Sequence, residues 1–186
     1  MRIRRSESSA ALNWGREAAG AKGRNILIDS RHFRDVLGSH PTGVSVITSI
    51  SEAGERWGLA VGTFTAISLD PPLAGFMPDK RSTSWKQIEK TGAFCVNILA
   101  AAQLDMCRRF ATRGGDKFDG ISHGQSPGGL PLLDGVLAWV ECGIDKVVEL
   151  GDHVLVVGAV RALDRVNDGA PLLFHRGGYH TLERLD

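Results

Sequence analysis

Two valine-rich runs in the C-terminal third of the chain constrain the fold most. They cover residues 136–150 (VLAWVECGIDKVVEL) and 152–166 (DHVLVVGAVRALDRV), and they meet at a tight turn around Gly151 and Asp152. β-Branched residues favour strands, and two such runs joined by a glycine-containing turn are typical of an antiparallel hairpin. The chain is therefore expected to build its core on an antiparallel sheet.

Shorter runs of the same kind predict further strands. Residues 43–50 (GVSVITSI) and 57–64 (WGLAVGTF) flank a turn that contains Gly54. Because these strands follow one another with short connections, the predicted fold is mainly β, an antiparallel β-barrel with about seven strands. The remaining strands are expected at 73–77 (LAGFM), at 92–99 (GAFCVNIL) and on both sides of Arg176, Gly177 and Gly178.

A few short helices are expected at the ends of this barrel. Residues 30–39 (SRHFRDVLGS) place Phe33, Val36 and Leu37 at helical spacing, which predicts one apolar face. Residues 81–90 (RSTSWKQIEK) begin with the hydroxyl residues that favour a helix start. A third helix is predicted over 101–111, with Leu104 and Cys107 facing inward and Arg108 considered as a further inward residue. Residues 112–135 are predicted to be rich in loop.

Composition fits one soluble domain with reduced thiols. The formal net charge of +1 gives no reason to expect nucleic acid or a membrane as a partner. The three cysteines lack a C-x-x-C spacing, which indicates free thiols and a cytoplasmic location. Residues 1–28 lack a long apolar run and are predicted to be a flexible N-terminal extension, followed by one domain over 29–186. Cys95 and Cys142 lie in apolar strands and are expected in the core.

No hydrolase, zinc-protease or nucleotide-loop motif is present, so an enzyme of this sequence would use a borrowed cofactor. Three segments support that view, although each also has a purely structural interpretation. Residues 57–72 (WGLAVGTFTAISLDPP) leave backbone groups for a flat ring, or form an ordinary edge strand. Residues 82–84 (STS) form a phosphate cradle at a helix start, or a plain N-cap. Residues 108–110 (RRF) hold a phosphate and stack a ring, or end a helix in solvent.

The sequence resembles the flavin reductase family, the small NAD(P)H-dependent components of two-component monooxygenases. The resemblance covers about residues 31–182, and the matching segments occur in the order of the family. It implies an FMN-binding split barrel, usually a homodimer. The segments that carry it are FRDVLGSHPTGVSVIT, TFTAISLDPPLAGF, STSWKQIEKTGAFCVNIL, RRFA…DKFDGI, LPLLDGVLAWVEC, GDHVLVVGAV and PLLFHRGGYHTL.

The resemblance also implies the roles of individual residues. His153 would orient the nicotinamide, although a histidine that stabilises a turn is the alternative. Gly62 stands where the family often has asparagine, which removes a side-chain bond to the flavin ring. The implied flavin-binding residues are Trp57, Gly58, Leu59, Ala60, Gly62, Thr63, Met77, Pro78, Asp79, Ser82, Thr83, Ser84, Arg109 and Phe110, and the implied nicotinamide-binding residues are His153, Phe174, His175, Arg176 and Gly177.

The implied activity is hydride transfer from NADH or NADPH to N5 of FMN or FAD, which supplies reduced flavin to a separate oxygenase. NADH is favoured because no arginine cluster for a 2′-phosphate is evident. The main alternative is a non-catalytic flavin-binding module with a storage or sensor role, and a further alternative is a barrel that binds haem or a deazaflavin. Segments 151–153 (GDH) and 176–179 (RGGY) favour the reductase, since a storage protein has no need of a nicotinamide groove.

Overall fold

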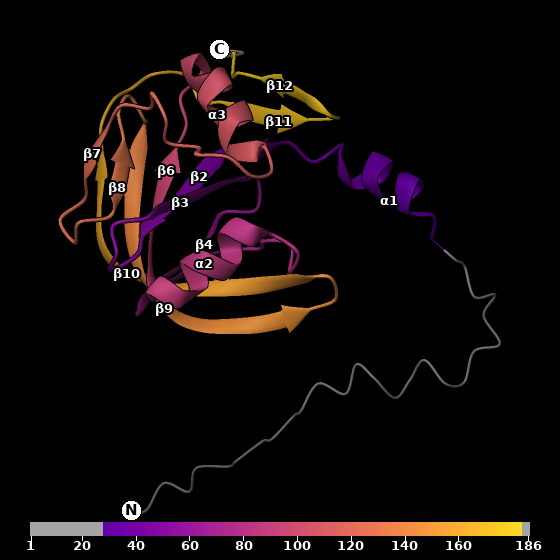
Figure 1. The fold of residues 1–186 in the computed structure, drawn as a ribbon. Helices are drawn as coiled ribbons and strands as arrows, with labels where there is room; N and C mark the ends of the chain where they lie inside the picture. Colours follow the sequence, from indigo (N-terminus) through magenta and orange to yellow (C-terminus); the bar gives the residue numbers. More distant parts are fainter. Residues whose placement is uncertain (1–27, 184–186) are drawn as a thin grey trace, which may run out of the picture.

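The computed structural model describes residues 28–183, and these residues form antiparallel sheets with short helices (Figure 1). Seven strands form the main sheet in the order β3-β2-β6-β9-β10-β5-β4. The predicted mainly β, antiparallel fold class is confirmed. The predicted extension of residues 1–28 lies, apart from Ile28, outside the described residues. The strands of the main sheet are β2 (Ser45–Ile50), β3 (Arg56–Val61), β4 (Thr65–Leu69), β5 (Pro72–Phe76), β6 (Ala93–Ile98), β9 (Ala138–Leu150) and β10 (His153–Arg165).

Smaller elements complete the described part of the chain. Three strands form a second sheet in the order β1-β11-β12, and two pair as a separate hairpin, β7-β8. No helix among residues 28–183 has the length and apolar character that crossing a membrane requires. The elements outside the main sheet are α1 (Ser30–Leu37), β1 (Thr42–Gly43), α2 (Thr83–Thr91), the 3₁₀ turn η2 (Ala101–Gln103), α3 (Leu104–Ala111), β7 (His123–Gln125), β8 (Pro131–Leu133), β11 (Leu173–His175) and β12 (Gly178–His180).

The predicted long hairpin is the centre of the main sheet. Strands β9 and β10 have 13 residues each and pair from the Leu150–His153 end to the Ala138–Arg165 end. The register shifts at two places along β10, between Val157 and Gly158 and again between Val160 and Ala162. Such irregularities bend a strand and increase its twist. The sheet therefore curves, and α2 lies within the curve (Figure 1).

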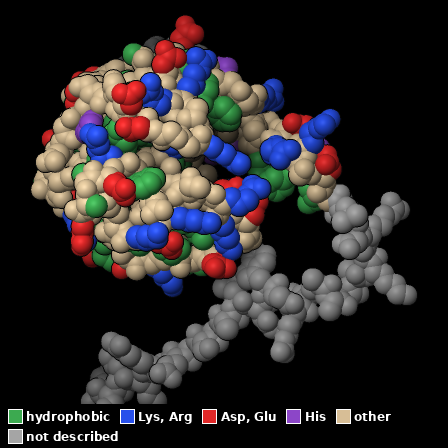
Figure 2. All heavy atoms as spheres, in the orientation of Figure 1, with side chains coloured by type: hydrophobic (Ala, Val, Ile, Leu, Met, Phe, Trp, Pro, Cys, Tyr) green, Lys and Arg blue, Asp and Glu red, His purple; other side chains and the backbone are tan. Residues whose placement is uncertain are grey.

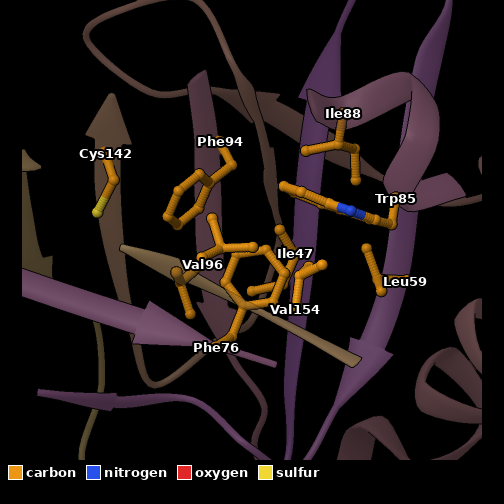
Figure 3. Close-up of a cluster of buried hydrophobic side chains, with 10 residues drawn as sticks. Ile47, Leu59, Phe76, Trp85, Ile88, Phe94, Val96, Cys142 and Val154 are labelled. Carbon is orange, nitrogen blue, oxygen red and sulfur yellow. The ribbon is translucent and has the colours of Figure 1, made fainter. Parts of the chain in front are cut away.

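Helix α2 joins the sheet through the first of two hydrophobic clusters (Figure 3). Trp85 and Ile88, three residues apart on one face of α2, are buried against the sheet. Phe76 of β5 meets the Trp85 ring edge-on at 5.8 Å and the Phe94 ring at 5.1 Å between centroids. Because edge-to-face aromatic pairs fix relative orientation as well as bury area, this cluster sets the position of α2 on the sheet.

A second cluster holds α3 on the other side of the chain's core. Cys107 and Phe110, on one face of α3, are buried with Phe118 from the loop that follows. The Phe110 and Phe118 rings meet edge-on with centroids 5.1 Å apart. The expectation that Cys107 faces inward is confirmed, as is the burial of Cys95 and Cys142; Arg108, also considered as an inward residue, is exposed.

The segment before the double proline differs from the prediction. Strand β3 ends at Val61, earlier than the predicted strand over 57–64, and residues 62–64 lie outside the strands. The chain then forms β4, turns at Asp70 and Pro71, and pairs antiparallel with β5 from Thr65↔Gly75 to Leu69↔Pro72. For Thr65–Leu69 the interpretation that the backbone lacks a sheet partner was therefore wrong, and the alternative, an edge strand, is correct. The two prolines lie at the turn of the hairpin, with Pro72 as the first residue of β5.

Two further differences concern segments whose pattern was ambiguous. Residues 112–135, predicted as loop, contain the short hairpin β7-β8. Helix α1 forms where predicted, with Asp29 as its N-cap, but Phe33, Val36 and Leu37 are all more than half exposed. The helix projects from the body of the protein with these hydrophobic side chains uncovered (Figures 1 and 2). Its apolar face therefore does not serve the core of this chain.

Tyr179, the one tyrosine of the chain, anchors the C-terminal hairpin β11-β12 to α3. A hydrogen bond of 3.5 Å joins its hydroxyl to the thiol of Cys107. This hydrogen bond, followed by burial, raises the pKa of Tyr179 to about 12. Because the folded-state pKa is raised above the ordinary value of about 10, the contribution to stability is complete below pH 10 and is lost as the pH rises toward 12.

Spectrophotometric titration of tyrosinate absorbance tests this arrangement. We expect the folded protein to titrate near pH 12, and the Cys107→Ala variant to titrate closer to about 10 because the hydrogen bond is gone. Circular dichroism on the same samples identifies the pH range over which the fold persists. A titration midpoint of Tyr179 near pH 10 in folded wild-type protein would contradict the hydrogen bond between Tyr179 and Cys107.

Candidate active site

A cavity of about 530 Å³ opens beside β3, between the segment that precedes α2 and the end of α3. Its size falls within the range of small-molecule sites, about 300–1,000 Å³. The structure thus brings together residues from segments far apart in the sequence. The implied site residues that line this cavity are Leu59, Ala60, Gly62, Thr63, Met77, Pro78, Asp79, Ser82, Thr83, Ser84, Phe110 and His153.

The β3 side of the pocket is lined by residues without large polar side chains: Leu59, Ala60, Val61, Gly62 and Thr63. The Thr63 hydroxyl accepts a hydrogen bond of 2.9 Å from the backbone N–H of Met77, which also lines the pocket. Gly62 lies against Thr42, and a Cβ at this position would stand 2.7 Å from Thr42 Oγ1. A larger residue at Gly62 would therefore require Thr42 to rotate. The wall suits a flat, largely apolar group.

The start of α2 forms the polar side of the pocket. Ser82 is the N-cap, and its hydroxyl accepts a hydrogen bond of 3.2 Å from Trp85 N–H. The N-cap interpretation of residues 82–84 is therefore correct for Ser82. Thr83 and Ser84, in the first turn, line the pocket. A helix start carries partial positive charge and N–H groups without intrahelical acceptors, so an anionic group of a ligand is favoured here.

The loop before α2 is held rigid by an ion pair at the pocket mouth. Asp79 accepts hydrogen bonds of 2.7 Å from both the backbone N–H and the guanidinium of Arg81. These bonds keep the pKa of Asp79 well below its usual range. The loop is also joined to β10, because Lys80 N–H donates to Asp152 O at 3.0 Å and Val154 N–H donates to Pro78 O at 3.1 Å. The pocket therefore has a pre-shaped rim.

His153 lies at the first position of β10 and faces the pocket. Its Nδ1 lies 2.8 Å from a carboxylate oxygen of Asp152, and this hydrogen bond lowers the pKa of Asp152. An isolated bridge pairs its backbone with Asp79. The ring is thus oriented by its neighbour, and both the ligand-orienting role and the turn-stabilising role considered from the sequence are compatible with this position.

Sequence reasoning missed Lys117, a partly buried cation of the pocket. Its ammonium group donates to Phe110 O at 3.0 Å, to Gly58 O at 3.1 Å and to Ser84 Oγ at 3.3 Å. Burial lowers the pKa of Lys117. The residue was quoted within DKFDGI without a role, because a lone lysine in a loop carries no local pattern. Also missed were Val61, Arg81, Ala111, Thr112, Arg113 and Gly114.

Comparison with known proteins places this chain in a family. The family model for the flavin reductase like domain matches residues 37–183. The chain belongs to the flavin reductase family. It is 49% identical over 152 residues to a flavin reductase of Pseudomonas putida, covering 82% of this chain and 89% of that protein. It is 47% identical over 156 residues to HsaB, the reductase subunit of a flavin-dependent monooxygenase of Rhodococcus jostii, covering 84% and 80%.

A solved structure agrees with this assignment. The nitrilotriacetate monooxygenase component B homologue of Mycobacterium thermoresistibile matches with a TM-score of 0.81 and 47% identity, over 84% of this chain and 88% of that one. The split-barrel fold class is thereby confirmed. As a flavin reductase the chain is an NAD(P)H:flavin oxidoreductase, and this activity is supported over the non-catalytic flavin-binding module.

Several residues implied by the resemblance lie outside the main pocket of this flavin reductase. Trp57 and Gly58 line a small adjoining cavity of about 60 Å³ that shares Ser84 and Lys117 with the pocket. The Arg109 guanidinium donates to Asp119 O. The remaining four, which were implied for nicotinamide binding, lie on the β11-β12 hairpin and do not line the pocket of their own chain: Phe174, His175, Arg176 and Gly177.

Proposed function

We propose that the pocket binds the flavin, and that the start of α2 receives its phosphate. The observation that carries this proposal is the convergence, in one cavity, of the largely apolar wall of β3 and the first turn of α2. The first suits a planar ring, and the second suits an anion attached to it. Bound there, the flavin would supply the hydride acceptor, so the chain itself needs no nucleophile.

The residues present fit this assignment. The hydrogen bond between Met77 N–H and Thr63 Oγ1 joins the segment that leads toward α2 to the residues that follow β3. Cationic side chains of Arg81 and Arg113 line the same cavity as the helix start. Because the β3 side offers aliphatic and small side chains, the flavin would be held there with few anchoring contacts. This supports a flavin that is taken up, reduced and released.

The nicotinamide is proposed to approach next to His153. Its ring lines the pocket and is oriented by Asp152 at 2.8 Å, so it is positioned to hold a carboxamide group beside the flavin site. The protein would act by holding the nicotinamide ring and the flavin ring side by side at reacting distance. NADH is the preferred donor in this proposal, and a relative 37% identical over 157 residues is named FMN reductase (NADH) SmoA.

Reduced flavin is proposed to pass to a separate oxygenase. Relatives are named as reductase subunits or components, including those of stachydrine N-demethylase and of a trigonelline monooxygenase. We further propose a homodimer. The exposed apolar residues of α1 favour it, because a helix that shows Phe33, Val36 and Leu37 to solvent leaves its hydrophobic face uncovered. A partner's β11-β12 hairpin would then be free to supply the nicotinamide contacts absent from one chain's pocket.

Oxidation of NADH followed at 340 nm with FMN, FAD and riboflavin in turn tests the proposed function. We expect turnover that requires added flavin and saturates with it, and slower turnover with NADPH than with NADH. Light scattering on the same preparation is expected to give twice the mass of one chain. Flavin binding without oxidation of either nicotinamide would contradict the proposed reductase mechanism, and a monomeric mass would contradict the dimer.

A further inference from the structure

Lys117 joins the three parts of the chain that form the pocket. Its ammonium group donates to Gly58 O on β3, to Phe110 O at the end of α3 and to Ser84 Oγ in the first turn of α2, at 3.1, 3.0 and 3.3 Å. The residues next to these three in the chain, Leu59, Ala111 and Thr83, all line the cavity. The Lys117 side chain therefore contacts each of the three elements that line the cavity: β3, α2 and α3.

The backbone around Lys117 is itself fixed. Phe118, the next residue, is 3% exposed and packs edge-on against Phe110. Its N–H donates to Asp116 Oδ1 at 2.9 Å, which closes a small turn around Lys117. Because Asp116 and Phe118 hold the backbone on either side of Lys117, the Lys117 amine starts from a fixed position next to its three acceptors. A flexible surface lysine would lose more side-chain entropy to make the same contacts.

The chemistry of the site requires an ammonium group. A lysine amine has three N–H donors on one atom, which matches three acceptors that converge on it. The guanidinium of arginine is planar and presents its donors as a fork, so it does not reproduce this arrangement. The contact on Phe110 O is also favourable in itself, because this carbonyl belongs to the last turn of α3, where the helix carries partial negative charge.

We propose that Lys117 is a positioning residue, which holds β3, α2 and α3 at the spacing that flavin requires. The inference rests on the proposed function of the pocket and deepens it. Lys117 acts through the walls, so its loss weakens the binding of flavins without a phosphate as well as of those that carry one. This separates it from a lysine that binds the phosphate directly.

Flavin affinity of the Lys117→Met variant tests the proposal. Methionine keeps the length and apolar stem of lysine but removes all three donors. Titration followed by quenching of flavin fluorescence is expected to give a Kd raised about tenfold for FMN, the scale of a hydrogen bond from a charged donor, and raised for riboflavin as well. In steady-state assays the KM for flavin is expected to rise more than kcat falls.

Two further variants sharpen the result. Lys117→Arg keeps the charge and is expected to leave the Kd for both flavins raised, because the fork does not meet three converging acceptors. Lys86→Met, an exposed lysine on α2, is the matched control and is expected to leave the Kd unchanged. Thermal melting of each variant reports whether the fold is retained.

The outcomes separate cleanly. A loss of affinity confined to FMN, or full recovery by arginine, would make Lys117 a phosphate ligand and overturn the proposal. A lower Tm with an unchanged Kd for both flavins would also overturn it, since Lys117 would then serve stability alone. If wild-type protein binds flavin but oxidises neither NADH nor NADPH, the proposed function fails, while the comparison of Kd values still decides the role of Lys117.

Discussion

Replacing Gly58 with alanine is expected to lower kcat/KM for flavin by up to about a hundredfold, because misplacement of a site by about 1 Å costs on this scale. An added Cβ would stand 2.5 Å from Cε1 and 2.7 Å from Cδ1 of Phe110. Phe110 is 1% exposed and packed against Phe118, so its ring has little room to retreat. Either β3 or α3 must then move, and both line the pocket.

Steady-state kinetics with FMN, combined with urea unfolding, measure this effect. Overpacking at this contact is expected to reduce the free energy of unfolding by about 1–3 kcal/mol as well. Gly43→Ala is the matched control: it also lies in a strand, but a Cβ there meets nothing within 4 Å. Normal kinetics in Gly58→Ala would show that the closeness of β3 and α3 does not determine the site.

Replacing Phe94 with alanine is expected to cost about 3–5 kcal/mol in the free energy of unfolding, the range for removing a buried aromatic side chain. Phe94 is fully buried, and the centroid of its ring lies 5.1 Å from that of Phe76. The ring also packs against Gly158, because a Cβ added to Gly158 would stand 2.6 Å from Phe94 Cζ. The cavity left behind lies between β6, β5 and β10. This loss is a large part of the 5–15 kcal/mol that typically stabilises a domain.

Urea unfolding followed by tryptophan fluorescence measures this loss, since Trp85 lies in the same cluster. Leu182→Ala, which removes a leucine side chain that is 62% exposed, is the control and is expected to change the free energy of unfolding by less than about 0.5 kcal/mol. A change of that small size in Phe94→Ala would mean that the sheet collapses to fill the cavity. The core would then be far more plastic than its close aromatic contacts indicate.

The sequence predicted those elements whose evidence is local. The β9-β10 hairpin was predictable because valine runs and a glycine turn sit side by side in the chain, and α2 because hydroxyl residues precede an apolar face. Strand β5 was predicted from its apolar run, whereas β4 was offered only as one of two interpretations, an edge strand, because its short mixed run ends at two prolines. Periodicity alone gives no warning of a strand that lies at a sheet edge and is largely exposed.

The candidate site was predictable mainly through resemblance. Most of the residues that line the pocket lie in the segments that resemble the family. Taken singly, the hydroxyl residues at 82–84 and the arginines at 108–109 could be explained by structure as well as by function. For Ser82 the structural interpretation, an N-cap, is correct. Lys117 was beyond reach for a different reason. Its importance comes from three acceptors spread between positions 58 and 110, which only the folded chain brings to one point.

Helix α2 joins two requirements that many enzymes keep on separate elements. Its first turn borders the pocket, while Trp85, in that same turn, and Ile88, in the next, are buried in the main cluster. A substitution that loosens the core is therefore expected to shift the first turn of the helix as well. Changes in the interior of the protein can thus alter ligand affinity through residues that never touch the ligand.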